Sequence, residues 1–287
     1  MKRAGFLAAC IGVVLLVAVS WCWFEFSADA SIPPHAIRIM SYNIGSIPPA
    51  LQKRDVALLA AIINEQAPDV VLLQEAYNLE KAKELAKRTG FRLLHFPGDK
   101  NSHVRIMSRY PGKLLGVKRL SEHDSGGQHV ICADIASPYG TLAVCSVHLK
   151  SISYQYKEFR DATRDILDKA AVVSRFASEL FVDNPRSRQV RELLAWLSGV
   201  VTGPVVIGGD FNSFCLSKAI RTMTASYQDT SWRTPSYFAA SHKSLGFSFP
   251  VKGDYIFASN DLQYAGTTIV VQSPGDHYPV VTNVILR

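Results

Sequence analysis

Cysteine is scarce in this chain, and its placement excludes a small domain built on disulfides. Only five cysteines occur among 287 residues, and Cys10 and Cys22 lie in an apolar N-terminal run. Disulfide scaffolds are short and rich in cysteine. The sequence also lacks internal repeats and low-complexity segments. With 48% hydrophobic residues, it is long enough to form one globular domain with a core of its own.

Acidic residues are the minority among the charged groups. The chain has 24 Asp and Glu against 31 Lys and Arg, which gives a formal net charge of +7. The first 34 residues are neutral in sum, so the basic excess lies in the remainder. A basic domain suits an anionic partner such as a nucleic acid, a phosphate ester or an anionic membrane surface.

Residues 4–24 form an uncharged, mostly aliphatic run that follows Lys2 and Arg3 and ends in an aromatic cluster. Its 21 residues are long enough to span a bilayer, so we expect an uncleaved membrane anchor. A secretory signal cleaved near Ala30 is the alternative, because the small residues at 28–30 suit cleavage. In both cases the positive end stays in the cytoplasm, and the domain over residues 37–287 lies outside it. Residues 31–36 are a linker between residues 1–30 and this domain.

Short apolar strands and amphipathic helices alternate along the domain. This mixture predicts a single α/β or α+β domain. A hairpin over 129–149 places Cys132 opposite Cys145. We expect two buried thiols there, because directly opposed strand positions strain a disulfide, although an oxidising location permits one. The other predicted strands are 37–43, 69–76, 91–96, 103–110, 203–210, 254–259, 267–272 and 278–286, and the predicted helices are 51–66, 79–88, 157–181 and a further one ending near 198.

Polar side chains stand at the ends of these apolar strands. Each one alone has a structural explanation, as a turn residue, a helix cap or a hydrogen-bonded core residue. Together they supply four carboxylates, two imidazoles and two amides at positions where sites are usually built. The set comprises Asn43, Glu75, His148, Asp210, Asn212, Asp254, Asp276 and His277.

This set suits the metal-assisted hydrolysis of a phosphodiester. Glu75 and Asn43 offer the oxygen ligands that Mg²⁺ or Mn²⁺ prefers. Asp210 is placed to take a proton from the attacking water, and Asn212 to orient it. The imidazoles of His148 and His277 can donate to phosphoryl oxygens.

Seven segments of the sequence resemble the endonuclease/exonuclease/phosphatase superfamily, which includes DNase I, exonuclease III-type enzymes, inositol polyphosphate 5-phosphatases and neutral sphingomyelinases. They occur in the order typical of that superfamily and span residues 37–286. They are "MSYNI" (40–44), "DVVLLQEA" (69–76), "RIMSRYP" (105–111), "SVHLKS" (146–151), "VVIGGDFNS" (205–213), "GDYIFAS" (253–259) and "GDHYPVV" (275–281).

The resemblance implies a DNase I-like four-layer sandwich, in which two mixed β-sheets pack face to face between outer helices. It also implies that Glu75 and Asn43 bind the metal, that Asp210 is the base with Asn212 beside it, and that Asp254 and Asp276 orient the histidines. The sequence departs from the pattern at Gly275, where Ser is common, and at Gly253, where Ile is common. The long helix 157–181 is also additional, either as cover for a sheet or as an insertion that faces the substrate.

The sequence indicates the type of reaction more clearly than the class of substrate. An endonuclease-type phosphodiesterase is the favoured interpretation, in which Arg105, Arg109 and Lys113 contact a phosphate backbone and Trp232 stacks on bases. A sphingomyelinase-like lipid phosphodiesterase is the second, since a tethered domain faces lipid headgroups and the aromatic residues of 231–249 could enter an interface. A phosphomonoesterase and an inactive binding domain are the remaining alternatives. We expect a monomer.

Overall fold

The computed structural model describes residues 34–52, 54–98, 102–122, 129–151, 179–243 and 252–287. The predicted anchor at 4–24 and all but the last three residues of the predicted helix 157–181 lie outside the described residues. Within the described residues, no helix combines the length and the apolar character needed to cross a membrane.

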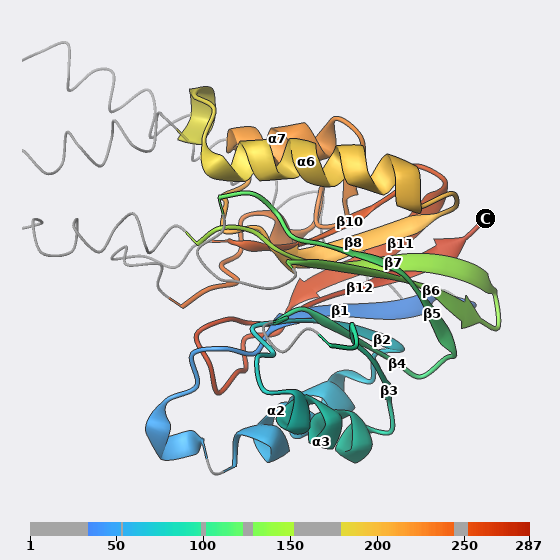
Figure 1. The fold of residues 1–287 in the computed structure, drawn as a ribbon, viewed down its shortest axis with the longest axis vertical. Coiled ribbons are helices and arrows are strands. Elements are labelled where there is room, and N and C mark those ends of the chain that lie inside the picture. The colour runs from blue at the N-terminus through green and yellow to red at the C-terminus, as the bar shows by residue number, and fades with distance from the viewer. Residues whose placement is uncertain (1–33, 53, 99–101, 123–128, 152–178, 244–251) are drawn as a thin grey trace, which may run out of the picture.

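Two six-stranded mixed sheets pack face to face at the centre of the molecule (Figure 1). The first sheet has the order β11 (Leu262–Ile269), β12 (Val280–Leu286), β1 (Ile37–Asn43), β2 (Val70–Gln74), β4 (Arg105–Ser108), β3 (Arg92–Leu94). The second has the order β5 (Gly112–Lys118), β6 (Val130–Ser137), β7 (Gly140–His148), β8 (Val205–Asp210), β10 (Asp254–Ala258), β9 (Gln228–Asp229).

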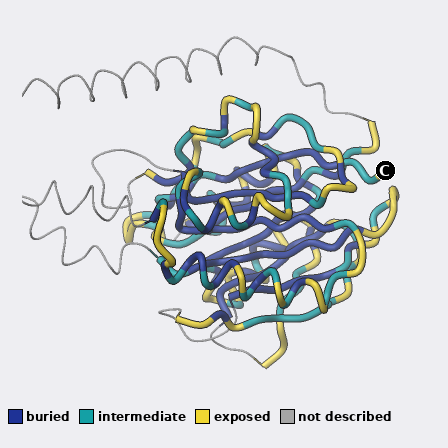
Figure 2. The backbone as a smooth tube through the Cα atoms, turned by 90° about the horizontal axis from the view of Figure 1, so that it is seen from above, coloured by how far each residue is buried: buried dark blue, intermediate teal, exposed yellow. Residues whose placement is uncertain are grey.

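Each sheet contains one parallel pair at its centre, β1 with β2 and β7 with β8, and the other pairs are antiparallel. These central strands are apolar on both faces because both are covered. One face meets the opposite sheet, where Ile39, Leu72, Val144 and Val206 belong to a common buried cluster. Figure 2 shows the resulting continuous buried layer.

Helices cover the outer face of each sheet. The helices α2 (Asp55–Gln66) and α3 (Leu79–Thr89) pack on the first sheet, and α6 (Pro185–Val200) and α7 (Lys218–Thr224) on the second. Local signals set their ends. Asn78 caps α3, which terminates at Gly90 in the left-handed conformation, and Asn184 with Ser187 forms a capping box at α6. The predicted four-layer sandwich is confirmed.

Several element boundaries differ from the predicted ones. The first helix begins at Asp55 and not at 51, because Pro49–Leu51 forms a separate 3₁₀ turn, η1. The strand predicted at 267–272 overlaps only the last three residues of β11, which begins at Leu262 and ends at Ile269. The sequence interpretation also missed β5, α7, the two-residue β9 and the 3₁₀ turn η2 (Pro235–Tyr237).

Cys132 and Cys145 form a disulfide between β6 and β7, so the expectation of two buried thiols is wrong. The two residues are directly opposed in the antiparallel ladder, as predicted. Their Cα atoms are 4.2 Å apart, the close spacing of a pair that exchanges no backbone hydrogen bonds. At this separation the sulfur atoms reach each other without displacement of either strand.

Candidate active site

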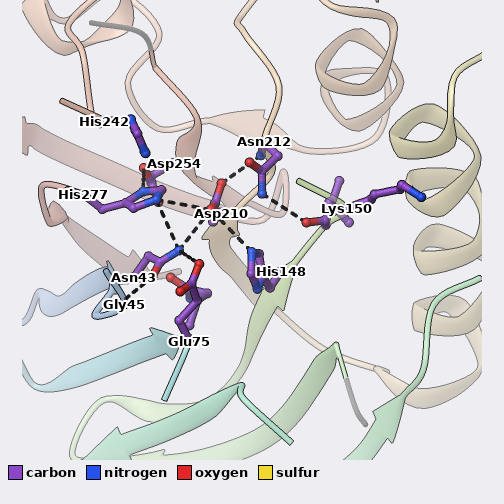
Figure 3. A network of polar contacts seen from close by, with 12 residues as sticks. Asn43, Gly45, Glu75, His148, Lys150, Asp210, Asn212, His242, Asp254 and His277 are labelled. Carbon is purple, nitrogen blue, oxygen red and sulfur yellow. Dashed lines mark hydrogen bonds and ion pairs between the residues drawn. The ribbon is translucent and has the colours of Figure 1, made fainter. Parts of the chain in front are cut away.

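The polar side chains singled out in the sequence meet at one end of the two sheets (Figure 3). Asn43, His148 and Asp210 are the last residues of β1, β7 and β8. Glu75 directly follows β2, and Asp254 begins β10. The register explains the meeting, since His148 and Asp254 both lie opposite Asp210 on the neighbouring strands.

Asn43 links the two sheets at this end. Its side-chain Nδ2 donates to Glu75 Oε1 (3.2 Å) in its own sheet and to Asp210 Oδ2 (3.1 Å) in the other. Its Oδ1 accepts from the backbone N–H of Gly45 (3.0 Å). Asn43 and Asp210 are buried, at 1% and 2% exposure. The carboxamide therefore orients two carboxylates that point toward a single small volume.

His277 and Asp254 form the closest histidine–carboxylate pair of this group. Their Nδ1 and Oδ2 atoms are 2.9 Å apart, which turns Nε2 of His277 toward Asp210 Oδ2 at 3.7 Å. His148 approaches the same Asp210 oxygen from the other side, with its Nε2 at 3.6 Å. Two imidazoles thus flank the carboxylate that the sequence indicates as the base.

The electrostatics of this group are those of buried, mutually repelling carboxylates. Burial, and next the Asp254 charge, raise the pKa of Asp210. Burial likewise raises the pKa of Glu75. For His277, burial disfavours the charged imidazole, but the Asp254 and Asp210 carboxylates outweigh it and raise its pKa. Its pKa is raised to about 10, which favours the imidazolium form at neutral pH.

Two of the functional positions adopt a backbone conformation that ordinary residues rarely take. Glu75 has φ 53° and Asn212 has φ 47°. Such left-handed residues are costly and concentrate at functional sites. At Asn212 the turn brings its own N–H to Asp210 Oδ1 (2.9 Å), while its Nδ2 donates to the Leu149 carbonyl (3.1 Å). The turn over Asp210, Phe211 and Asn212 therefore holds the Asp210 carboxylate through its own backbone.

A glycine makes room for Glu75. A Cβ atom at Gly45 would overlap the Glu75 side chain. Gly275 in turn makes room for Gly45, because a Cβ atom at position 275 would lie 2.5 Å from the Gly45 carbonyl oxygen. The serine that is common at position 275 in similar sequences is therefore excluded here by close approach of the backbone.

The residues present fit a hard divalent cation. Carboxylate oxygens of Glu75 and Asp210 converge here, and oxygen ligands are those that Mg²⁺ and Mn²⁺ prefer. The Asn43 carboxamide holds both carboxylates through its Nδ2, while its Oδ1 accepts from the Gly45 N–H. In addition, Asp254 Oδ1 is buried and has no hydrogen-bond partner among the described residues. Ligand atoms of Asp210, Asp254 and His277 all lie within 4.8 Å of one another.

Asp276 is placed differently from what the resemblance implies. It does not orient His148 or His277. Its Oδ2 lies 3.5 Å from Nε2 of His242, a residue that the sequence interpretation did not single out. The His242 ring in turn packs edge-on against the His277 ring, with centroids 4.3 Å apart. His242 lies in a stretch of serine and aromatic residues without periodicity, so no pattern in the sequence marks it as a site residue.

The predicted substrate-binding Arg109 is not near this group. It follows β4 beside the start of β2, at the end of the sheet opposite Glu75. There its Nε donates to the Pro68 carbonyl and its guanidinium covers the Phe91 ring. Arg105, unlike the exposed Arg109, is buried, and it donates to the Ala76 carbonyl next to Glu75.

Trp232 lies on the second sheet's β9 side and is 53% exposed. Its ring packs edge-on against Tyr237, and Tyr237 packs in the same way against Phe238, which is 54% exposed. Trp232 and Tyr237 line a cavity of about 360 Å³ beside β9 and β11. Among the described residues, no contact joins Trp232 to the Asp210 group.

A second cavity, of about 390 Å³, opens beside Glu75 between the β1 and β2 loops and helices α2 and α3. Apolar side chains such as Ile44, Ile47 and Leu59 line it, together with the half-exposed ring of Tyr77. The paired Asp55 and Lys81 add no net charge. A molecule held at Glu75 therefore has an uncharged groove next to it.

The profile of the Endonuclease/Exonuclease/phosphatase family matches residues 40–277 of this chain. The chain belongs to this family. A search of curated protein sequences gave no match. Members of the endonuclease/exonuclease/phosphatase family include metal-dependent phosphodiesterases and nucleases, and the polar group described above lies within the matched residues.

Solved structures of this family share the fold. D. rerio TDP2 complexed with single strand DNA product is 16% identical over 87% of this chain and 98% of its own, with a TM-score of 0.60. The human Nocturnin catalytic domain with bound sulfate anion is 18% identical over 88% and 94%, with a TM-score of 0.59. A Beutenbergia cavernae endonuclease/exonuclease/phosphatase is 19% identical over 88% and 72%, with a TM-score of 0.59. At these identities the likeness concerns the fold alone.

Proposed function

We propose that the chain is a divalent-metal-dependent phosphodiesterase of the endonuclease type, which acts outside the cytoplasm. One observation carries the proposal. Asn43 hydrogen-bonds both Glu75 and Asp210, and two imidazoles flank the same Asp210 oxygen, all at the common end of the two sheets. A structural role would not require so many buried charged groups in one place, because each is costly to desolvate.

In this proposal the cation is held by Glu75, with Asp210 adjacent. Asn43, which the resemblance implies as a second ligand, positions both carboxylates through its Nδ2. When bound, the cation supplies Lewis-acid stabilisation of the charge that develops on the phosphoryl oxygens. The residues of the chain supply the general base and the hydrogen-bond donors. Asp210 Oδ2 accepts the proton of the attacking water, and the N–H of Asn212 fixes the other Asp210 oxygen. The His277 imidazolium, held by Asp254, donates to the phosphoryl group, and His148 donates from the opposite side.

Nucleic acid is the proposed substrate. The basic excess of the chain favours a polyanion, since Lys and Arg contacts to phosphates supply most nonspecific affinity. TDP2, which shares the fold, is known with a single strand DNA product. The uncharged groove beside Glu75 offers space for the part of the substrate next to the scissile phosphate.

A lipid phosphodiesterase is the second candidate, and a specific observation favours it. Trp232 and Phe238 are both more than half exposed and belong to one edge-on ring series with Tyr237. Together with the apolar run 4–24, they suit a protein held at a bilayer. The catalytic group would be the same.

The test compares two substrates with the full chain purified in mild detergent. Nicking of plasmid DNA and headgroup release from sphingomyelin vesicles are measured with Mg²⁺, with EDTA, and with the Asp210→Ala variant. We expect DNA nicking that EDTA and the variant both abolish, and that weakens steeply with salt. Headgroup release without DNA nicking would show that the same site belongs to a lipid phosphodiesterase. DNA nicking that survives both treatments would refute the site assignment.

Localisation is tested separately. We propose that residues 4–24 anchor the chain with its domain outside the cytoplasm, with cleavage near Ala30 as the alternative. Protease added to intact cells should digest the anchored domain, and a cytoplasmic marker protein should survive. The mass of the protein recovered from cells distinguishes the uncleaved chain from one that begins near residue 31.

A further inference from the structure

A three-residue segment, Ser241–His242–Lys243, lies against the Asp254–His277 pair and has no part in the proposed chemistry. Ser241 and His242 are buried at 0% and 5% exposure. Figure 3 shows His242 beside His277 and Asp254, on the side away from Asn43 and Glu75. We refer to these three residues as the 241–243 clamp.

The backbone of the clamp is paired with the backbone that carries His277. His242 and His277 form an isolated antiparallel bridge. The N–H of Lys243 donates to the Asp276 carbonyl (2.7 Å), and the N–H of Tyr278 donates to the Ser241 carbonyl (2.7 Å). The backbone on both sides of His277 is therefore fixed to one short segment.

The same segment also fixes the partner of His277. The Ser241 hydroxyl oxygen accepts from the backbone N–H groups of Gly253 and Asp254, each at 2.9 Å. These groups begin β10, where the carboxylate that holds His277 is located. Ser241 thus ties the position of the Asp254 backbone to that of the His277 backbone.

His242 completes the contact through its side chain. Its ring meets the His277 ring edge-on, with centroids 4.3 Å apart and planes at 88°. Its Nε2 lies 3.5 Å from Asp276 Oδ2, so the residue before His277 is held as well. Rotation of the His277 ring away from Asp210 would require the His242 ring to move.

Lys243 holds the turn that precedes His277. Its Nζ donates to the carbonyls of Ser273 and Gly275, in the turn that precedes His277. Gly275 itself has no side chain that could hold this turn. The contacts of the clamp supply the support that the glycine cannot.

We propose that the 241–243 clamp positions the Asp254–His277 pair for catalysis, and that His242 is its main positioning residue. The proposal rests on the proposed function, in that His277 is taken to donate to the phosphoryl group. His242 touches neither the substrate nor the metal in this proposal. It acts by keeping His277 Nε2 directed at the volume beside Asp210, and misplacement of such a group costs rate more than binding.

The kinetic test uses two substitutions of His242, each of which keeps one of its two contacts and removes the other. His242→Phe keeps an aromatic ring against His277 but loses the donor to Asp276, and His242→Gln keeps a donor. In Mg²⁺-dependent phosphodiester hydrolysis by the full chain, we expect His242→Phe to lower kcat about 10- to 100-fold with little change in KM. His242→Gln should recover a large part of this loss. His35→Ala, which changes a histidine that packs on Tyr139 far from the site, is the matched control.

A second readout does not depend on activity. A hydrogen-bonded imidazole N–H exchanges slowly with water, so the Nδ1–H of His277 should give a distinct proton resonance in ¹⁵N-labelled protein, assigned by its loss in His277→Gln. We expect this resonance to weaken or vanish in His242→Phe and in Ser241→Ala, and to persist in His35→Ala. Circular dichroism shows which variants remain folded. If His242→Phe does not fold, Ser241→Ala tests the proposal in its place.

The outcomes separate the two proposals. If Asp210→Ala is as active as the unchanged protein, the proposed function fails, and the His277 resonance alone decides whether the clamp positions the pair. If Asp210→Ala is inactive while the folded clamp variants keep their kcat within about twofold and retain the resonance, the clamp proposal is overturned.

Discussion

At the scale of single residues, Asp210 combines the features of a general base. It is buried, and it accepts hydrogen bonds from Asn43 Nδ2 and the N–H of Asn212, with the His277 imidazole 3.7 Å away. General-base catalysis typically contributes about 10²- to 10⁴-fold to a rate. We therefore expect Asp210→Asn, which is nearly isosteric, to lower kcat by at least about 100-fold in a Mg²⁺-dependent hydrolysis assay.

The matched control for this substitution is Asp261→Asn, which changes an exposed carboxylate in the turn between β10 and β11. That variant should retain the activity of the unchanged protein. Equal losses in the two variants would show that the effect is not specific to the site, and no loss in either would remove Asp210 from the mechanism.

The raised pKa of Asp210 also predicts a pH dependence. The base acts in its ionised form, so acidification removes activity as the carboxylate becomes protonated. Burial and the Asp254 charge raise the pKa of Asp210, so the loss occurs at a higher pH than for an ordinary aspartate. In a profile of kcat/KM against pH, we expect the acid limb to have its midpoint above about 4, the ordinary value. Fluorescence over the same range shows that the protein stays folded. A midpoint at or below 4 would contradict the prediction.

At the scale of elements, the loop after β1 determines where Glu75 can lie. A Cβ atom at position 45 would overlap the Glu75 side chain, so Gly45→Ala must displace it. We expect this variant to need about 10-fold or more Mg²⁺ for half-maximal activity, the scale typical of disturbed ligand support. Gly203→Ala is the control, because no atom lies near a Cβ atom there. A Gly45→Ala variant with an unchanged Mg²⁺ requirement would argue against Glu75 as a ligand.

The disulfide between β6 and β7 gives a prediction about stability. Cys132 and Cys145 are 13 residues apart, and a closed loop of about 15 residues contributes up to about 3 kcal/mol by restricting the unfolded chain. We expect the Cys132→Ala/Cys145→Ala double variant to melt at a lower temperature than the unchanged protein, with catalysis retained below that temperature. The Cys215→Ala variant, which changes the remaining cysteine of the described residues, should melt unchanged. Identical melting of the double variant in oxidising buffer would show that the bridge does not form.

The sequence predicted the central elements of this fold and missed the peripheral ones, for a physical reason. The strands β1, β2, β7 and β8 are covered on both faces, so their sequences are continuous apolar runs that can be recognised directly. The edge strand β5 is only partly buried, and α7 has just seven residues. Neither carries a long periodic pattern. The boundary error at α2 has a similar origin, since Pro49 favours a separate 3₁₀ turn.

The candidate site was predictable to the extent that its members end strands. Glu75 and Asp210 follow apolar runs, and such positions converge at one edge of a sheet. His242 follows no strand, and it reaches the site only through pairing with the segment around His277. The partner of Asp276 could not be predicted for the same reason. Arg109 was misplaced because its position in the chain does not reveal which end of β4 faces the site.

At the scale of the whole molecule, the site is a junction between the two sheets. Asn43 and Glu75 extend from the first sheet, and Asp210 and Asp254 from the second. Among the described residues, burial first and neighbouring carboxylates second raise the pKa of Glu75 and of Asp210, so both negative charges are disfavoured here. A cation at this junction would attract groups from both sheets at once. Its binding should therefore stabilise the complete sandwich and not only one loop.

This coupling predicts that metal binding raises the melting temperature. A ligand that binds only the folded state at about 100 times its Kd adds about 2.7 kcal/mol of stability. For a domain of this size, 1 kcal/mol corresponds to roughly 2–4 °C. We therefore expect saturating Mg²⁺ or Mn²⁺ to raise the melting temperature of the EDTA-treated protein by several degrees at pH 8. In Glu75→Gln the shift should be much smaller, because the ligand charge is lost while the shape is kept. Glu80→Gln, which changes an exposed glutamate of α3, should show the full shift. Equal shifts in all three proteins would mean that the cation acts elsewhere, and no shift in the unchanged protein would mean that Asn43, Glu75 and Asp210 do not form a metal site without substrate.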